Sequence, residues 1–157
     1  VEISNPGKPL VDTLRFLDYN PQSRNEKLAY FMRRINVCEE RGSGIDKVVD
    51  ATEIATLPAP SFSYEDNYFK ATLYGPMPLR KMSKVDKIRT CYLHCCLKFV
   101  SNENMTNESL RGRFGISEKN YPMASRIISD TKSANLIKDA DPDNKSPKNF
   151  SYVPFWA

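Results

Sequence analysis

The stretch NESLRGRFGISEKNYPMASRIISDTKSANLIK (Asn107–Lys138) predicts two short helices joined by a tight turn. Gly115 suits the left-handed residue that ends the first helix, because it lacks the Cβ that makes this conformation costly. Residues suited to burial then recur at three- and four-residue spacing, which predicts a second helix with one inward stripe: Ala124, Ile127, Ile128 and Thr131. A helix, a glycine turn and a one-sided second helix together describe a helix-turn-helix.

The second helix of this motif is expected to start close to Asn120. Pro122 has no backbone N–H to donate, so it fits in the first helical turn. Either Ser117 or Asn120 can cap that turn by accepting a hydrogen bond from a free backbone N–H. With this start, Lys119 lies in the turn that precedes the helix.

The segments on either side of the motif predict a wing. Residues 84 to about 100 predict one supporting amphipathic helix, and Leu136–Lys138 predicts a strand. Residues 139–149 would then form the tip of a hairpin, and residues 150–153 its returning strand. The sequence therefore predicts a winged helix-turn-helix domain over residues 84–157.

Charge is distributed unevenly along the 157 residues. Residues 1–78 contain 9 Lys and Arg against 11 Asp and Glu, whereas residues 79–157 contain 14 against 8. Only the second half, at +6, has the balance expected of a protein that binds a polyanion. Two solvated surfaces of different sign are the simpler alternative.

Duplex DNA is the partner that we expect for the second half. The second helix of a helix-turn-helix lies in the major groove, where its first residues reach the base edges. The candidate contacts are Lys119, Asn120 and Tyr121, Ser125 and Arg126 one turn later, Arg111, Arg113, Lys81 and Lys84 on the phosphate backbone, and Lys138, Lys145 and Lys148 on the wing. Asn120 can pair with adenine, and Arg126 with guanine or a phosphate.

Other roles for the second half stay open. Asp139, Asp141 and Asp143 place three carboxylates on the wing and weaken it as a DNA contact. A wing that binds another protein is therefore an alternative, since fold does not fix function. Winged-helix regulators often act on DNA as dimers, so a homodimer is a further alternative.

The first half predicts a small α/β module. A strand at residues 1–4 ends at the Asn5-Pro6-Gly7 turn, helices follow at about 24–36 and 45–55, and two strands within 61–74 form a hairpin. Leu28, Phe31, Met32 and Ile35 form the apolar face of the helix at 24–36. Gly42-Ser43-Gly44 precedes the next helix, an arrangement that can cradle phosphate or simply close one helix and open another.

Three motifs in this half resemble a bacterial family: EISNPG (Glu2–Gly7), RNEKLA (Arg24–Ala29) and EERGSGIDKVVD (Glu39–Asp50). The family comprises transcriptional regulators and helicase-related ATP-binding proteins. Its members join a Schlafen/AlbA-like domain to a divergent Bergerat-type ATPase module and often to a C-terminal winged helix. The resemblance implies an α+β chain that begins with a truncated Bergerat-like α/β module. Residues 1–76 would be the C-terminal lobe of that module, 77–83 a linker and 84–157 the winged helix.

The resemblance also implies a nucleotide site. Its residues would be Asn5, Gly7, Arg24, Asn25, Gly42, Ser43 and Gly44. The Asn-bearing helix that holds Mg²⁺ in Bergerat enzymes is absent from this sequence, and Asn5 and Pro6 replace the Asp-x-Gly of the first box. We therefore expect no ATP hydrolysis and no resident cofactor in this chain, while ATP binding by the intact protein stays open. Because the sequence starts with Val1, we expect it to be part of a longer protein.

Four cysteines and one histidine complete the reactive side chains. Cys91, His94 and Cys95 share one helical turn, which is a poor tetrahedral zinc site, so we expect buried free thiols and no metal. No nucleophile–base constellation suggests a catalytic residue. Reduced thiols, together with the lack of a signal peptide or a membrane-spanning apolar run, indicate a cytoplasmic protein without a membrane partner.

Overall fold

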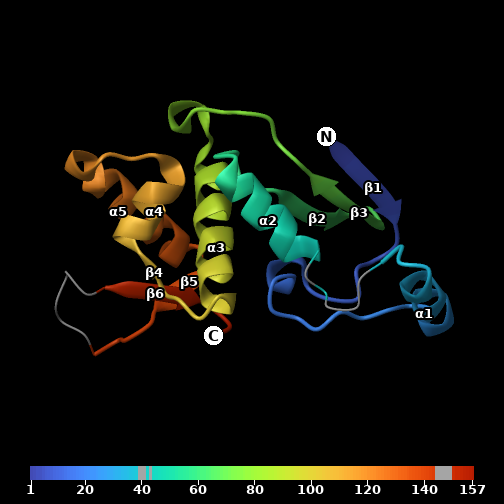
Figure 1. Cartoon of the computed structure of the whole chain (residues 1–157). Coiled ribbons are helices and arrows are strands. Elements are labelled where there is room, and N and C mark those ends of the chain that lie inside the picture. Colours follow the sequence, from blue (N-terminus) through green and yellow to red (C-terminus); the bar gives the residue numbers. More distant parts are fainter. Residues whose placement is uncertain (39–41, 43, 144–149) are drawn as a thin grey trace.

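Helix α3 (Lys84–Val100) runs through the middle of the molecule and organises the elements around it. In the computed structural model, which describes residues 1–38, 42, 44–143 and 150–157, α2 (Gly44–Ile54) packs on one side of α3. Helices α4 (Asn107–Phe114) and α5 (Tyr121–Ser133) pack on the other side (Figure 1). All seven residues from Thr90 to Cys96 are buried, because α3 is covered from several directions at once.

The first half contains a three-stranded antiparallel sheet. Strands β1 (Glu2–Pro6), β2 (Ser61–Glu65) and β3 (Tyr68–Thr72) are arranged in the order β1-β3-β2, with Glu2 and Ser61 both opposite Thr72. The hairpin turn between β2 and β3 consists of Asp66 and Asn67, whose φ angles of 50° and 64° match the left-handed pair of a tight hairpin. The predicted hairpin is confirmed.

Two elements of the first half differ from the prediction. Helix α1 spans Glu26–Arg34 and not 24–36, because the Asn25 side chain caps it by accepting a hydrogen bond from Leu28 N at 3.0 Å. Three of the four residues of its predicted apolar face are exposed to solvent, namely Leu28, Ile35 and Phe31, which is 57% exposed. Helix α1 lies at the far end of the molecule from α5 (Figure 1), and none of its residues is fully buried. A short 3-10 helix, η1 (Thr13–Arg15), precedes it.

The second half alternates helices with short strands. After α3 come β4 (Met105–Thr106), α4, a 3-10 helix η3 (Glu118–Asn120), α5, β5 (Ile137–Asp139) and β6 (Ser151–Pro154). The strands form an antiparallel sheet in the order β4-β6-β5. Helix α4 ends at Gly115, whose φ of 64° is the predicted left-handed cap. Pro122 lies in the first turn of α5, also as predicted.

One hydrophobic core joins the two halves. Leu17, Val49 and Ala59 belong to the same buried cluster as the cysteines of α3. Ala59 N donates a hydrogen bond to Thr90 Oγ1 at 3.2 Å, and Arg89 Nε donates one to Ala59 O at 3.1 Å. The segment 77–83, predicted as a linker, contains the 3-10 helix η2 (Leu79–Lys81) and the buried Met82. Leu79 of this segment packs against the core cluster that the two halves share.

The C-terminal Trp156 forms a second set of contacts between the two halves. Its Nε1 donates a hydrogen bond to Tyr92 Oη at 3.2 Å, and the Tyr92 hydroxyl in turn donates to Leu14 O in η1. The Arg15 guanidinium lies 5.4 Å from the centre of the Trp156 ring, a cation–π distance. The last residues of the chain are thus anchored on α3 and on the first half.

Candidate nucleic-acid interface

The first turns of α5 present the predicted reading residues to solvent. Ala124, Ile127, Ile128 and Thr131 are buried against the core, so the stripe predicted from their spacing is confirmed. The opposite side of α5 and the preceding η3 expose Lys119, Asn120, Tyr121, Ser125 and Arg126. Asn120 occupies the N-cap position, but its side chain makes no capping hydrogen bond, and its Nδ2 donates to Ser117 Oγ at 3.2 Å. These five side chains therefore share one exposed region.

Asn107 fixes the position of α5 on α4 and was not singled out from the sequence. Its Nδ2 donates hydrogen bonds to Ser125 Oγ at 3.0 Å and to Tyr121 O at 3.3 Å. Its Oδ1 accepts a hydrogen bond from Arg111 Nε at 3.1 Å, so Arg111 is held beside the same helix. A polar residue at a helix start is common, and only the packing of α4 on α5 reveals this role.

Arg113 does not belong to this exposed region. The sequence predicted that it contacts DNA phosphates, but the residue is only 8% exposed. Its Nη2 donates a hydrogen bond to Leu57 O at 2.6 Å, and its Nε lies 3.4 Å from Glu53 Oε2. Burial lowers the pKa of the guanidinium, and the nearby Glu53 carboxylate opposes that shift. The prediction is corrected: Arg113 fastens α4 to the first half.

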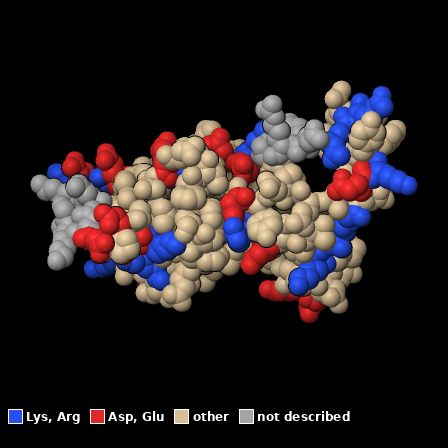
Figure 2. All heavy atoms as spheres, turned by 90° about the horizontal axis from the view of Figure 1, so that it is seen from below, with Lys and Arg blue, Asp and Glu red and all other residues tan. Residues whose placement is uncertain are grey.

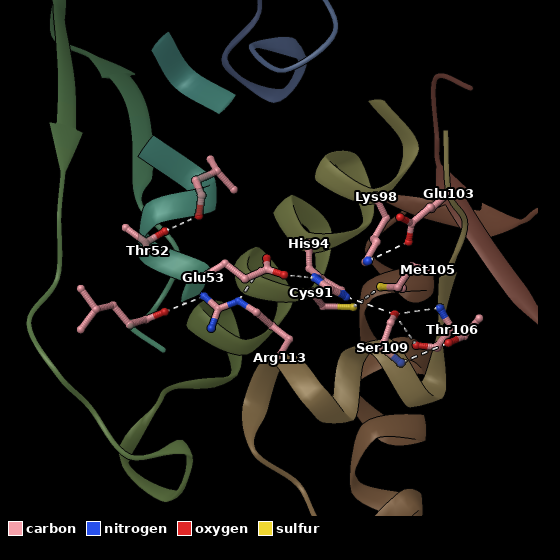
Figure 3. Close-up of polar contacts among 12 residues, drawn as sticks. Thr52, Glu53, Cys91, His94, Lys98, Glu103, Met105, Thr106, Ser109 and Arg113 are labelled. Atoms are coloured by element: carbon pink, nitrogen blue, oxygen red, sulfur yellow. Dashed lines mark hydrogen bonds and ion pairs between the residues drawn. The ribbon is translucent and has the colours of Figure 1, made fainter. Parts of the chain in front are cut away.

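Glu53 is also the centre of a partly buried series of polar contacts (Figure 3). His94 Nδ1 lies 2.7 Å from Glu53 Oε1, and His94 Nε2 lies 3.1 Å from Ser109 Oγ. Ser109 and Thr106 form the capping box of α4, with their side chains bonded to each other's backbone N–H groups. The order serine, histidine, carboxylate is that of a hydrolase triad. However, His94 is only 2% exposed, and Ser109 Oγ already takes part in the capping box of α4. These polar contacts therefore hold α2, α3 and α4 together.

The cysteines of α3 lie in the apolar core. Burial raises the pKa of the Cys91 and Cys96 thiols to about 12, so both are protonated and unreactive at neutral pH. His94 directs both ring nitrogens to Glu53 and Ser109 and not to these thiols. Within the described residues, no three His, Cys, Asp or Glu side chains are grouped in a way that could hold a metal ion.

The segment predicted as a wing carries charges of both signs. Lys138 is exposed and its Nζ donates to Ala157 O, while Lys132 is paired with Asp139 at 2.7 Å. Asp141 and Asp143 are exposed, and the predicted contacts Lys145 and Lys148 lie outside the described residues. Figure 2 shows acidic and basic side chains interspersed at this end of the molecule. Among the described residues, the predicted wing is thus less basic than the region around α5.

The predicted nucleotide residues are brought together only in part. Arg24 and Gly42 line a common pocket of about 450 Å³, together with residues such as Pro21 and Phe69. Gly42 has a φ of +66°, and a Cβ at this position would come within 2.9 Å of Pro21 Cδ, so both conformation and space favour glycine. The Arg24 guanidinium donates to Lys8 O at the pocket.

The other described residues predicted to bind a nucleotide lie outside this pocket. Asn5 lies in β1 opposite Phe69, and Gly7 N donates to Asn67 O at 2.7 Å at the end of the same sheet. The Asn25 side chain is used as the cap of α1. Gly44 is the first residue of α2, and Ser43 lies outside the described residues. None of these four described residues lines the pocket beside Arg24.

Comparison with known proteins bears on the first half. Residues 1–73 match the family described as "Putative ATP-dependent DNA helicase recG C-terminal". The match covers all three motifs on which the resemblance rests, and it supports an ATPase-like module in this part of the chain. No curated protein and no solved structure matches the chain. No helix in the described part of the chain has the length and apolar character needed to cross a membrane.

Proposed function

We propose that this chain is a DNA-binding part of a bacterial cytoplasmic transcriptional regulator. Residues 84–157 act as a winged helix-turn-helix that contacts duplex DNA, with α5 in the major groove. The first half, an ATPase-like module by its family match, has a regulatory or assembly role. The proposal includes no catalytic step in this chain.

The order of elements supports a winged helix. A supporting helix α3, a short strand, the pair α4 and α5, and the β5–β6 strands follow one another, and the first strand β4 pairs with β6. Helix α5 packs on α3 and α4 with its polar side exposed to solvent, as a helix that enters a groove requires.

The observation that carries the proposal is the exposed region at the start of α5. Lys119, Asn120, Tyr121 and Arg126 are exposed, and the fold uses none of these four side chains for its core. Lys and Arg side chains at such a position neutralise phosphates, and Asn and Arg can read adenine and guanine. Lys81 at the end of η2, Lys84 at the start of α3 and Arg111 in α4 add positive charge for the backbone of the duplex.

Titration of the full chain with duplex DNA at two salt concentrations tests the proposal. We expect an affinity that falls steeply as salt rises, because bound phosphates release counterions. The double variant Lys119→Ala/Arg126→Ala should bind at least tenfold more weakly, with a salt slope lower by about 1 for each phosphate that is no longer neutralised. The matched control is Lys8→Ala/Lys27→Ala, which removes two exposed cations from the first half. No binding at low salt, or equal weakening in both double variants, would refute DNA reading by α5 and favour a protein-binding wing.

Nucleotide binding by the intact protein is a second candidate function. It is favoured by the pocket that Arg24 and Gly42 line within the family-matched residues. Calorimetric titration of the intact protein with ATP and Mg²⁺ tests it, and Arg24→Gln should weaken any binding. Saturable heat that Arg24→Gln abolishes would support this candidate independently of the DNA result.

A further inference from the structure

A groove between η2, α3 and α5 combines an apolar surface with charged side chains, and of its lining residues the proposed function uses only Arg126. It has a volume of about 530 Å³, which is within the range of small-molecule sites. We refer to it as the α3–α5 groove. Its apolar surface comes from Leu79, Met123 and Ile127, and its charged residues come from all three elements: Arg80, Lys87 and Arg126.

The apolar part of the groove is accessible. Ile127 is buried, but Met123, which follows Pro122 in the first turn of α5, is 46% exposed. An unbranched, polarisable methionine side chain adapts its shape to different apolar partners. A DNA phosphate, which is fully polar, would leave this surface unused.

The charge of the groove is positive. The side chains of Arg80, Lys87 and Arg126 form no hydrogen bond or ion pair with other described residues. The single carboxylate in the lining, Asp130, is already paired with Lys84 at 2.7 Å. Three cations therefore surround an apolar surface without an internal counterion.

We propose that the α3–α5 groove binds a small organic anion, a molecule that joins an apolar chain or ring to a carboxylate. The apolar part lies against Leu79, Met123 and Ile127, where it is removed from water. The carboxylate accepts charge-assisted hydrogen bonds from Arg80, Lys87 or Arg126. This inference does not depend on DNA binding.

Each methionine methyl group reports on ligand binding near its own position in the molecule. The chain contains five methionines, so a protein with ¹³C-labelled methionine methyls gives one NMR signal for each. We expect sodium octanoate to shift the Met123 signal in a saturable way. Octan-1-ol, which has the chain without the charge, and octylamine, which has the opposite charge, should bind at least tenfold more weakly.

Variants separate a specific site from general apolar adsorption. Arg80→Gln/Lys87→Gln should weaken octanoate binding at least tenfold, whereas Lys8→Gln/Lys27→Gln, which removes two exposed cations outside the groove, should leave it unchanged. The Met105 signal, from a fully buried side chain, shows that each variant is folded. Equal shifts with octan-1-ol, no effect of the double variant, or shifts at Met32 on α1 in place of Met123 would overturn the proposal.

Discussion

The Glu53 carboxylate lies 3.4 Å from the Arg113 guanidinium and thereby joins α2 to α4 across the central helix α3. Its second oxygen is 2.7 Å from His94. Glu53 comes from the part of the chain that matches the helicase-related family, whereas Arg113 and His94 do not. The two parts of the sequence are therefore connected through buried polar groups as well as through apolar packing.

Replacing Glu53 by Gln should destabilise the protein strongly. The change leaves the buried Arg113 charge without its carboxylate, and loss of one partner of a buried pair costs about 3 kcal/mol or more. The free energy of unfolding, measured by urea titration, gives the cost. Asp50→Asn on the exposed side of the same helix is the control and should stay within about 0.5 kcal/mol of the parent protein. Similar costs for both variants would mean that the ion pair contributes little.

The glycine inside α4 and the glycine that caps it should respond to alanine with opposite signs. Gly115 has a φ of +64°, so Gly115→Ala should cost about 1–2 kcal/mol through backbone strain alone, because a Cβ there meets no atom within 4 Å. Gly112 lies inside α4 with the same free space, and Gly112→Ala should stabilise by about 0.5–1 kcal/mol. Thermal unfolding should show the melting temperature lowered in the first variant and raised in the second. A gain in Gly115→Ala would show that α4 does not end in the left-handed conformation.

Stability should decrease above pH 9 because of the buried thiols. Burial raises the pKa of Cys91 and Cys96 from 9.0 to about 12, and it raises the pKa of Cys95 as well. Between these pH values the folded chain holds protons that the unfolded chain has released. The free energy of unfolding is therefore highest below pH 9 and falls as the pH rises above it. Each thiol contributes a slope of up to about 1.4 kcal/mol per pH unit.

Unfolding in urea between pH 7 and pH 11, with reductant present, measures this dependence. Cys96→Ala should have a shallower decline than the parent protein because one raised pKa is removed. The partly exposed Cys38, replaced by Ala, is the matched control and should leave the slope unchanged. A flat profile across this range would contradict the burial of the thiols.

Removing the Tyr92 hydroxyl should weaken the contact that links the C-terminal Trp156 to α3 and to the first half. In Tyr92→Phe, Trp156 Nε1 and Leu14 O both lose this partly buried hydrogen-bond partner, and the loss of such a bond costs about 0.5–1.5 kcal/mol. The midpoint of urea unfolding should fall accordingly. Tyr68→Phe removes a hydroxyl from a side chain that is 53% exposed and should change the midpoint little.

Local chemistry made much of the second half predictable. Gly115, Pro122 and the spacing of Ala124, Ile127 and Ile128 each impose a conformation within a few residues, and the structure follows them. The same holds for the hairpin at Asp66 and Asn67. Such features depend on neighbouring atoms only, so sequence alone is sufficient.

Long-range partners explain where prediction from sequence failed. Arg113 was assigned to DNA because of its charge, although its spacing of three from the buried Leu110 places both on the inward face of α4. Its partner Glu53 lies 60 residues earlier, and no local pattern connects the two. The apolar face of α1 was expected to be buried but is largely exposed. Periodicity shows that a helix face is apolar, but it does not show whether another element packs on that face.

The contact of Arg15 with Trp156 has a practical consequence. The chain has one tryptophan, and its indole is in contact with a cation from the first half and with the edge of Phe99 on α3. A ligand that binds either half of a cooperatively folded chain raises the stability of both. Intrinsic fluorescence from this one indole should therefore register a nucleotide, an organic anion or DNA in a single unlabelled melting experiment.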